Sequence, residues 1–129
     1  FWNDKLVGKV SGSDTIRQAM RPGESRMLSI HKIENNPQFI STNRHIMQGY
    51  VDMVKIEWDE SKNQLKGIAR TVAGETYKIV VACNGRRVKS VAAKDAKTGW
   101  IQVDEKNGLI SLSIDSNSGG DIPWIASFE

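Results

Sequence analysis

The sequence predicts an all-β protein, an antiparallel two-sheet β-sandwich of the Greek-key or immunoglobulin-like type. Apolar and polar residues alternate with period two along most of the chain, which is the pattern of half-buried strands. Clusters of Gly, Pro, Asn and Asp separate the alternating segments, as turns do in antiparallel sheets. The length of 129 residues suits one domain with one hydrophobic core.

The N-terminal third predicts a hairpin. Residues 13–20, "SDTIRQAM", fit a strand and also a short helix capped by Ser13 or Asp14. The strand is favoured because Pro22-Gly23 fits a type II turn and residues 25–33 alternate beyond it. The stretch "ENNPQ", residues 34–38, is a candidate joint between subdomains in an otherwise single domain of residues 1–129.

Three further hairpins follow in a row. Residues 49–72 read as two strands joined by a polar turn at 59–63. Residues 77–93 repeat the pattern around Asn84-Gly85, a pair that adopts the positive φ angles of a tight hairpin. Residues 99–115 do so around Asn107-Gly108. The apolar residues of this third hairpin, which we expect on one face, are Ile110, Leu112 and Ile114.

The last segment predicts a final strand that closes the sandwich. Trp124, Ala126 and Phe128 alternate with Ile125 and Ser127. Pro123 stands near the start of this segment, where a strand can spare one backbone donor.

Composition and charge argue against nucleic-acid and membrane partners. The formal net charge is +3, and the densest basic group, Arg86, Arg87 and Lys89, lies in a stretch, 84–99, without aromatic residues. No apolar run approaches the 18 or so residues that cross a bilayer. The single cysteine, Cys83, cannot form an intrachain disulfide and sits in an apolar run, so we expect it to be buried.

No motif predicts a catalytic, cofactor or metal site. His31 and His45 have no second ligand at metal-binding spacing, and no Gly-rich phosphate loop or nucleophile elbow occurs. Four neighbouring acids could act on a glycosidic bond. They are Asp52, Glu57, Asp59 and Glu60. Asp59 and Glu60, however, fall at the hairpin turn, where acids are expected for solvation.

The segment from Asp115 to Asp121, "DSNSGGD", partly matches a calcium-binding loop. Asp115, Asn117 and Gly120 fall at about positions 1, 3 and 6 of such a loop. The match ends at about position 12, where Ala126 stands in place of a bidentate glutamate. We therefore interpret the segment as an ordinary loop.

Two of the four tryptophans are candidates for binding oligosaccharides. Exposed indole rings on a β-sandwich can stack on sugar rings. Trp58 lies at a strand end beside the acidic turn, and Trp100 follows Gly99 at the start of a hairpin. Trp2 and Trp124 are expected in the core or at its border.

The stretch "NRHIMQGYVD", residues 43–52, predicts a structural corner rather than a reactive site. Gly49 permits a bend or bulge, and Arg44, His45 and Gln48 offer side-chain hydrogen bonds to a bent backbone. We expect His45, Gln48 and Gly49 to contribute to stability.

Several stretches carry a resemblance to a known family. "FWNDKLVGKV", "MRPGESRMLSIHK" and "PQFISTNRHIMQGYVDM" resemble the C-terminal β-sandwich region of bacterial α-galactosidase-like glycoside hydrolases. The likeness spans essentially the whole chain and is strongest over residues 1–52; the closing "PWIASF" also agrees.

The resemblance implies a division of labour. In that family an (α/β)₈ barrel carries the catalytic aspartates, and sandwich modules follow it. No barrel fits into 129 residues, so none of those aspartates maps onto this chain. The resemblance thus implies a non-catalytic accessory domain, a piece of a secreted or periplasmic hydrolase whose partner is the barrel of the same polypeptide. A carbohydrate-binding module is the alternative.

Overall fold

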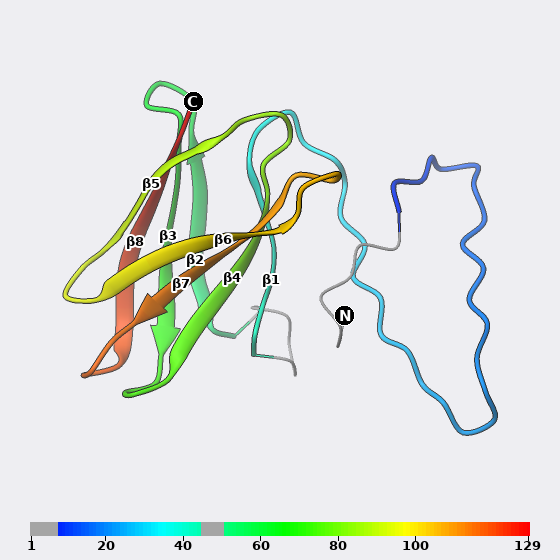
Figure 1. Ribbon diagram of the computed structural model, residues 1–129, viewed down its shortest axis with the longest axis horizontal. Helices are drawn as coiled ribbons and strands as arrows, with labels where there is room; N and C mark the ends of the chain where they lie inside the picture. Colours follow the sequence, from blue (N-terminus) through cyan, green and yellow to red (C-terminus); the bar gives the residue numbers. More distant parts are fainter. Residues whose placement is uncertain (1–7, 45–50) are drawn as a thin grey trace. The chain divides into compact units, whose positions relative to one another are not determined.

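The computed structural model describes residues 8–44 and 51–129 (Figure 1). The chain divides into two compact units, which we call the N-terminal unit, Phe1–Ile30, and the sandwich unit, His31–Glu129. The division falls a few residues before the joint expected at 34–38. Each unit is described by itself below.

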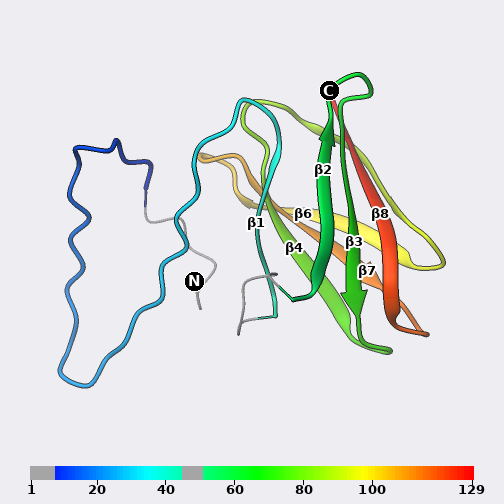
Figure 2. The ribbon, with the colours of Figure 1, turned by 180° about the vertical axis from the view of Figure 1, so that it is seen from behind.

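The sandwich unit confirms the predicted all-β fold. Its described residues form eight strands: β1 (Gln38–Thr42), β2 (Met53–Asp59), β3 (Gln64–Thr71), β4 (Thr76–Ala82), β5 (Val88–Ala93), β6 (Lys97–Asp104), β7 (Leu109–Asp115) and β8 (Gly120–Phe128). They form two four-stranded antiparallel sheets, sheet A in the order β1-β4-β7-β6 and sheet B in the order β2-β3-β8-β5. Figures 1 and 2 show the two layers facing each other.

The two sheets are related strand by strand. The consecutive pairs β1–β2, β3–β4, β5–β6 and β7–β8 each begin in one sheet and end in the other, so we call each pair a leg. The legs lie in the same order in both sheets: β1–β2, β3–β4, β7–β8, β5–β6. The outermost legs, β1–β2 and β5–β6, therefore supply all four edge strands.

The core lies between the sheets, on the faces that the alternation predicted. Ile110, Leu112 and Ile114 of β7 are at most 1% exposed. From sheet B, Trp124 (1% exposed) is among the largest fully buried side chains. β8 alternates buried and exposed residues, whereas β4 and β7 contain runs buried on both faces. One face of sheet B is therefore exposed to solvent, whereas the central strands of sheet A, β4 and β7, have buried residues on both faces.

The predicted hairpin at Asn84-Gly85 is wrong in its pairing, although the turn itself forms. Asn84 and Gly85 have φ angles of 48° and 89°, and the Arg86 amide donates to the Cys83 carbonyl at 3.1 Å. β4, however, lies between β1 and β7, while β5 pairs with β8 in the other sheet. Because β4 has no free edge, the tight turn passes the chain across the sandwich. The hairpins β2–β3 and β6–β7 are confirmed.

Pro123 occupies the fourth position of β8, a central strand, where proline is rare. Its carbonyl accepts from the Lys94 amide at 3.0 Å, one residue beyond the end of β5. In an antiparallel strand the amide and carbonyl of one residue point to the same side. The missing donor of Pro123 therefore faces the side of β8 where β5 has ended.

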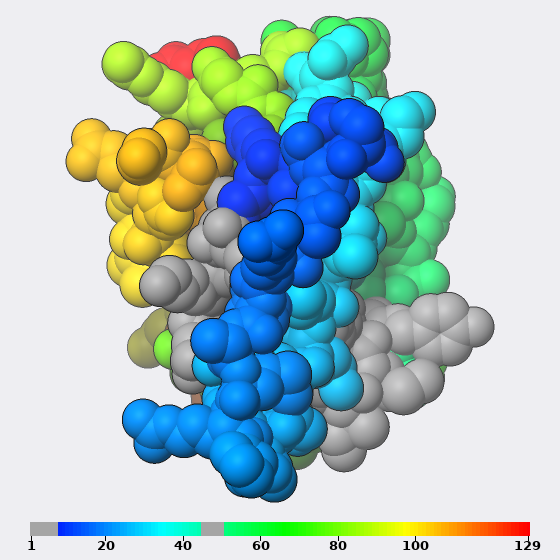
Figure 3. Space-filling model, turned by 90° about the vertical axis from the view of Figure 1, so that its right-hand side faces the viewer, coloured from blue at the N-terminus to red at the C-terminus, as the bar shows by residue number. Residues whose placement is uncertain are grey.

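The N-terminal unit contains the predicted turn but not the predicted strands. The Glu24 amide donates to the Arg21 carbonyl at 3.0 Å, and Gly23 has φ 79°, as a type II turn requires. Residues 8–30 nevertheless contain no strand and no helix. Across the turn, the Arg26 guanidinium donates to Gln18 Oε1 at 2.9 Å. In the space-filling view of Figure 3 these residues form a narrow, elongated band.

Candidate functional site

Trp58, the first of the two tryptophans predicted to stack on sugar rings, is half-buried near the end of β2. The guanidinium carbon of Arg86 lies 5.1 Å from the centroid of the Trp58 ring, a cation–π distance. Phe128 meets the ring edge to face, with 6.0 Å between centroids and 62° between planes. Any sugar that stacks on Trp58 has to use the ring face opposite Arg86.

The polar groups around Trp58 bond to one another. The indole N–H donates to Glu60 Oε2 at 2.5 Å. Arg86 donates to Glu60 Oε1 at 3.2 Å and also to Asn63 Oδ1. This cluster was not predicted, because the stretch around Arg86 contains no aromatic residue. The ring is held in place, but these donors and acceptors are already used within the chain.

Trp100, the second predicted platform, lies on the edge strand β6 and is 44% exposed. The nearest polar side chains on the same side of the strand are engaged. Thr98 donates to the Val91 carbonyl at 2.9 Å, and Gln102 Nε2 donates to the Leu109 carbonyl at 2.8 Å. Trp100 thus offers an exposed ring without free amides or hydroxyls from its own strand beside it.

The fold does not bring the two tryptophans together. Trp58 belongs to the leg β1–β2, and Trp100 belongs to the leg β5–β6. These legs are the outermost ones on opposite sides of both sheets. The two rings therefore cannot line one binding groove.

The acidic residues near the β2–β3 turn have separate partners. Glu57 pairs with Lys55 at 2.7 Å, Asp59 pairs with Lys66, and Glu60 pairs with Arg86 at 3.2 Å. Glycoside hydrolysis needs two carboxyl groups that face one another across the sugar bond. Each of these carboxylates instead faces a cation from its own neighbourhood.

Asp52, the fourth acid, joins three strands through a cluster that the sequence did not predict. Its Oδ2 accepts from the Tyr77 hydroxyl at 2.5 Å and from Thr42 Oγ1 at 2.8 Å, and its carbonyl accepts from the Arg70 amide at 2.7 Å. Burial, and next the Asp52 carboxylate, raises the pKa of the Tyr77 phenol well above its usual range. Tyr77 therefore remains a protonated donor that ties β4 to Asp52.

The Asp59–Lys66 contact should make stability depend on pH in acid. The hydrogen bond from Lys66, assisted by Ser61, lowers the pKa of Asp59 from 3.8 to about 2. Because the folded pKa lies below the unfolded one, the contact stabilises the fold above about pH 4, and this contribution is lost as pH falls toward about 2. We expect Asp59→Asn to flatten the decline of the urea midpoint across this interval.

The control for this measurement is Asp95→Asn, at an exposed position outside the acidic turn. Its midpoint should follow that of the parent at every pH. An Asp59→Asn protein whose midpoint declines as steeply as the parent between about pH 4 and pH 2 would contradict the prediction.

The described residues offer no metal site. Over 8–44 and 51–129, no group of three His, Cys, Asp or Glu side chains is arranged to hold a metal ion. The acids that border the calcium-like segment accept hydrogen bonds from protein donors. Asp115 accepts from Thr76 at 2.5 Å, and Asp121 accepts from Arg70 Nε at 2.8 Å.

Three predicted residues cannot be placed. His45, Gln48 and Gly49 lie outside the described residues, so their expected structural role stays a prediction. Within the described ranges, the structure has no helix of the length and apolar character needed to span a membrane.

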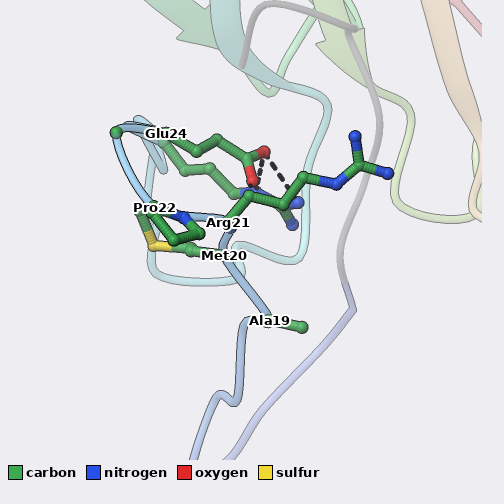
Figure 4. A pocket seen from close by; sticks show the side chains of 7 residues that line it. Ala19, Met20, Arg21, Pro22 and Glu24 are labelled. Atoms are coloured by element: carbon green, nitrogen blue, oxygen red, sulfur yellow. Dashed lines mark hydrogen bonds and ion pairs between the residues drawn. The ribbon is translucent and has the colours of Figure 1, made fainter.

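A shallow hollow of about 740 Å³ lies at the turn of the N-terminal unit (Figure 4). Met20 and Pro22 supply apolar atoms to its lining, and Glu24 and Arg26 supply polar ones. Glu24 Oε1 accepts from Arg26 Nε at 3.0 Å, and Glu24 Oε2 accepts from the Arg21 amide at 2.9 Å. Since these charged groups are bonded to one another, they stabilise the turn.

Comparison of the chain with protein-family models, with curated proteins and with solved structures gives no match.

Proposed function

We propose that the chain is a non-catalytic accessory domain that docks on a neighbouring folded domain. The observation that carries the proposal is the exposed apolar surface of the N-terminal unit. Ile16, Met20, Leu28 and Ile30 are 38%, 51%, 38% and 77% exposed. The resemblance described above supplies the partner: the catalytic barrel of a glycoside hydrolase, encoded in the same polypeptide.

Leaving these apolar side chains in water is unfavourable. Full burial of one such side chain contributes about 1.5–3 kcal/mol. Residues 8–30 have no strand or helix that could bury them within the unit. Larger exposed apolar patches on a soluble domain mark interaction surfaces. A neighbouring domain that covers Met20 and Ile30 would recover this free energy.

The alternative, a carbohydrate-binding module, rests on the exposed ring of Trp100. Sugar sites combine a stacking ring with free hydrogen-bonding groups that select the sugar. The polar side chains beside Trp100 on β6 already bond to backbone carbonyls. This geometry favours docking over sugar binding as the main function.

The first test concerns the partner. The reading frame that encodes the chain should also encode an (α/β)₈ barrel, and the separately expressed barrel should bind the chain in calorimetry. Met20→Asp and Ile30→Asp should each weaken binding about 10- to 100-fold, because each places a charge in an apolar contact. The matched control, Ile125→Asp on the open face of sheet B, should bind like the parent.

The second test separates the two functions. The isolated chain should release no nitrophenol from nitrophenyl α- or β-glycosides. Its tryptophan fluorescence should not change with oligosaccharides that contain galactose, arabinose or xylose. A saturable change that Trp58→Ala or Trp100→Ala abolishes would instead establish sugar binding. A reading frame without a barrel, or a barrel that does not bind the chain, would overturn the docking proposal.

A further inference from the structure

Strand β6 has an unusual apolar character for an edge strand. Trp100, Ile101 and Val103 are 44%, 63% and 40% exposed. Trp100 pairs with the buried Leu112, whereas Ile101 pairs with Ser111 on the other face. Apolar side chains are therefore exposed on both faces of β6. In the described part of the chain, no strand pairs with the outer backbone groups of β6.

The other edge strands are short or carry charges within the strand, and β6 has neither feature. β1 has only five residues, and β2 carries the exposed ion pair of Lys55 and Glu57 in its middle. β5 carries Lys89 beside a register shift. Short length, charges and bulges are the devices that keep edges from pairing. In β6 the charges stand only at the ends, and its register shift falls after Gln102.

The charges at the two ends of β6 favour a second copy of the same chain as the partner. β6 begins with Lys97 and ends with Asp104, which Glu105 follows. No ion pair engages Lys97 or Glu105 in the described parts of the chain. When the β6 strand of a second copy runs antiparallel to that of the first, its acidic end lies beside the basic end of the first strand. Two-fold symmetry then forms this contact twice. A parallel arrangement would bring like charges together.

We infer that two copies of the chain associate through antiparallel pairing of their β6 strands, with Ile101 near the two-fold axis. Sheet A of one copy then continues into sheet A of the other. Each copy has one β6 edge, so the pairing closes as a dimer and does not propagate. The interface buries Trp100, Ile101 and Val103, and it does not depend on the docking function proposed above.

The first experiment measures the mass of the full chain by sedimentation velocity over a concentration series. We expect a reversible monomer–dimer equilibrium. Ile101→Asp should leave only monomer, because symmetry places two carboxylates next to each other in the interface. The matched control, Ile125→Asp, and the docking variant Met20→Asp should dimerise like the parent. Circular dichroism should show that all three variants fold.

The second experiment tests the charge pairing. Lys97→Glu and Glu105→Lys should each weaken dimerisation about three- to tenfold, since two exposed pairs are lost. The double variant should restore the parent affinity. Such a restoration requires that residue 97 of one copy faces residue 105 of the other, so a partner other than a second copy would not produce it. Four outcomes would overturn the inference: a monomer at every concentration, a dimeric Ile101→Asp protein, open-ended oligomers, or a double variant that stays weak.

Discussion

Gly67→Ala should destabilise the protein by about 2–3 kcal/mol, although it adds only one methyl group. Gly67 of β3 lies opposite Trp124 of β8 in the register. A Cβ at residue 67 would lie 2.7 Å from three indole atoms, including Nε1. Trp124 is 1% exposed, so the ring has no room to move aside without disturbing the core.

A double-mutant cycle identifies the cause of this loss. Trp124→Phe removes part of the ring that fills the space above Gly67. It also removes the buried indole N–H, which has no hydrogen-bond partner among residues 8–44 and 51–129. In the Trp124→Phe background, we expect Gly67→Ala to cost less than about 1 kcal/mol. The difference between the costs in the two backgrounds is the coupling energy of the pair, which is large for residues in direct contact.

Urea unfolding followed by circular dichroism gives all four free energies, because this signal does not depend on Trp124. The control is Gly99→Ala in β6, where the added Cβ would meet only Ser113 Oγ at 3.2 Å. It should cost less than Gly67→Ala. If Gly67→Ala is equally costly with Trp and Phe at residue 124, the contact with the ring is not the reason.

Local pattern predicted which face of a strand is buried but not which strands are neighbours. The alternation in residues 110–114 and 124–128 correctly placed the buried side chains of β7 and β8. The pairing of β5 with β8 has no local signal, because the two strands are far apart in the sequence. β1 was missed because a register shift between Phe39 and Ser41 interrupts its short alternation.

The candidate site shows the same limit. The position of Trp100 at the start of a hairpin suggested exposure, and its ring is exposed. The contact of Arg86 with Trp58 joins a residue of the β4–β5 connection to a residue of β2, and the bond of Asp52 to Tyr77 joins residues 25 positions apart. Neither pair lies close enough in the sequence to form a recognisable motif. Side chains that the fold brings together from distant segments could not be paired from the sequence.

The N-terminal unit shows why alternation alone does not make strands. Residues 25–33 alternate, and the turn before them forms as predicted. Alternation predicts which side chains share a face, but it does not predict whether the segment pairs as a strand. Residues 8–30 contain no strand, although Arg26 donates to Gln18 across the turn.

A second glycine tests how closely two connections between the sheets pack. Gly119, between β7 and β8, has φ 66°, which disfavours side chains. A Cβ there would also lie 2.7 Å from the amide nitrogen of Ala73, in the connection from β3 to β4, and 3.2 Å from the carbonyl oxygen of Thr71, the last residue of β3. Both neighbours are backbone atoms, so neither can rotate away.

Gly74 is the matched control, because it lies in the β3–β4 connection with φ 75° and has no atom within 4 Å of a Cβ position. Gly74→Ala should therefore cost about 1 kcal/mol, the conformational term alone. Gly119→Ala should cost about 3 kcal/mol, because the clash with backbone adds to the same term. Urea midpoints at unchanged slope give both values. Equal losses at the two positions would show that the contact of Gly119 with Ala73 does not limit the size of residue 119.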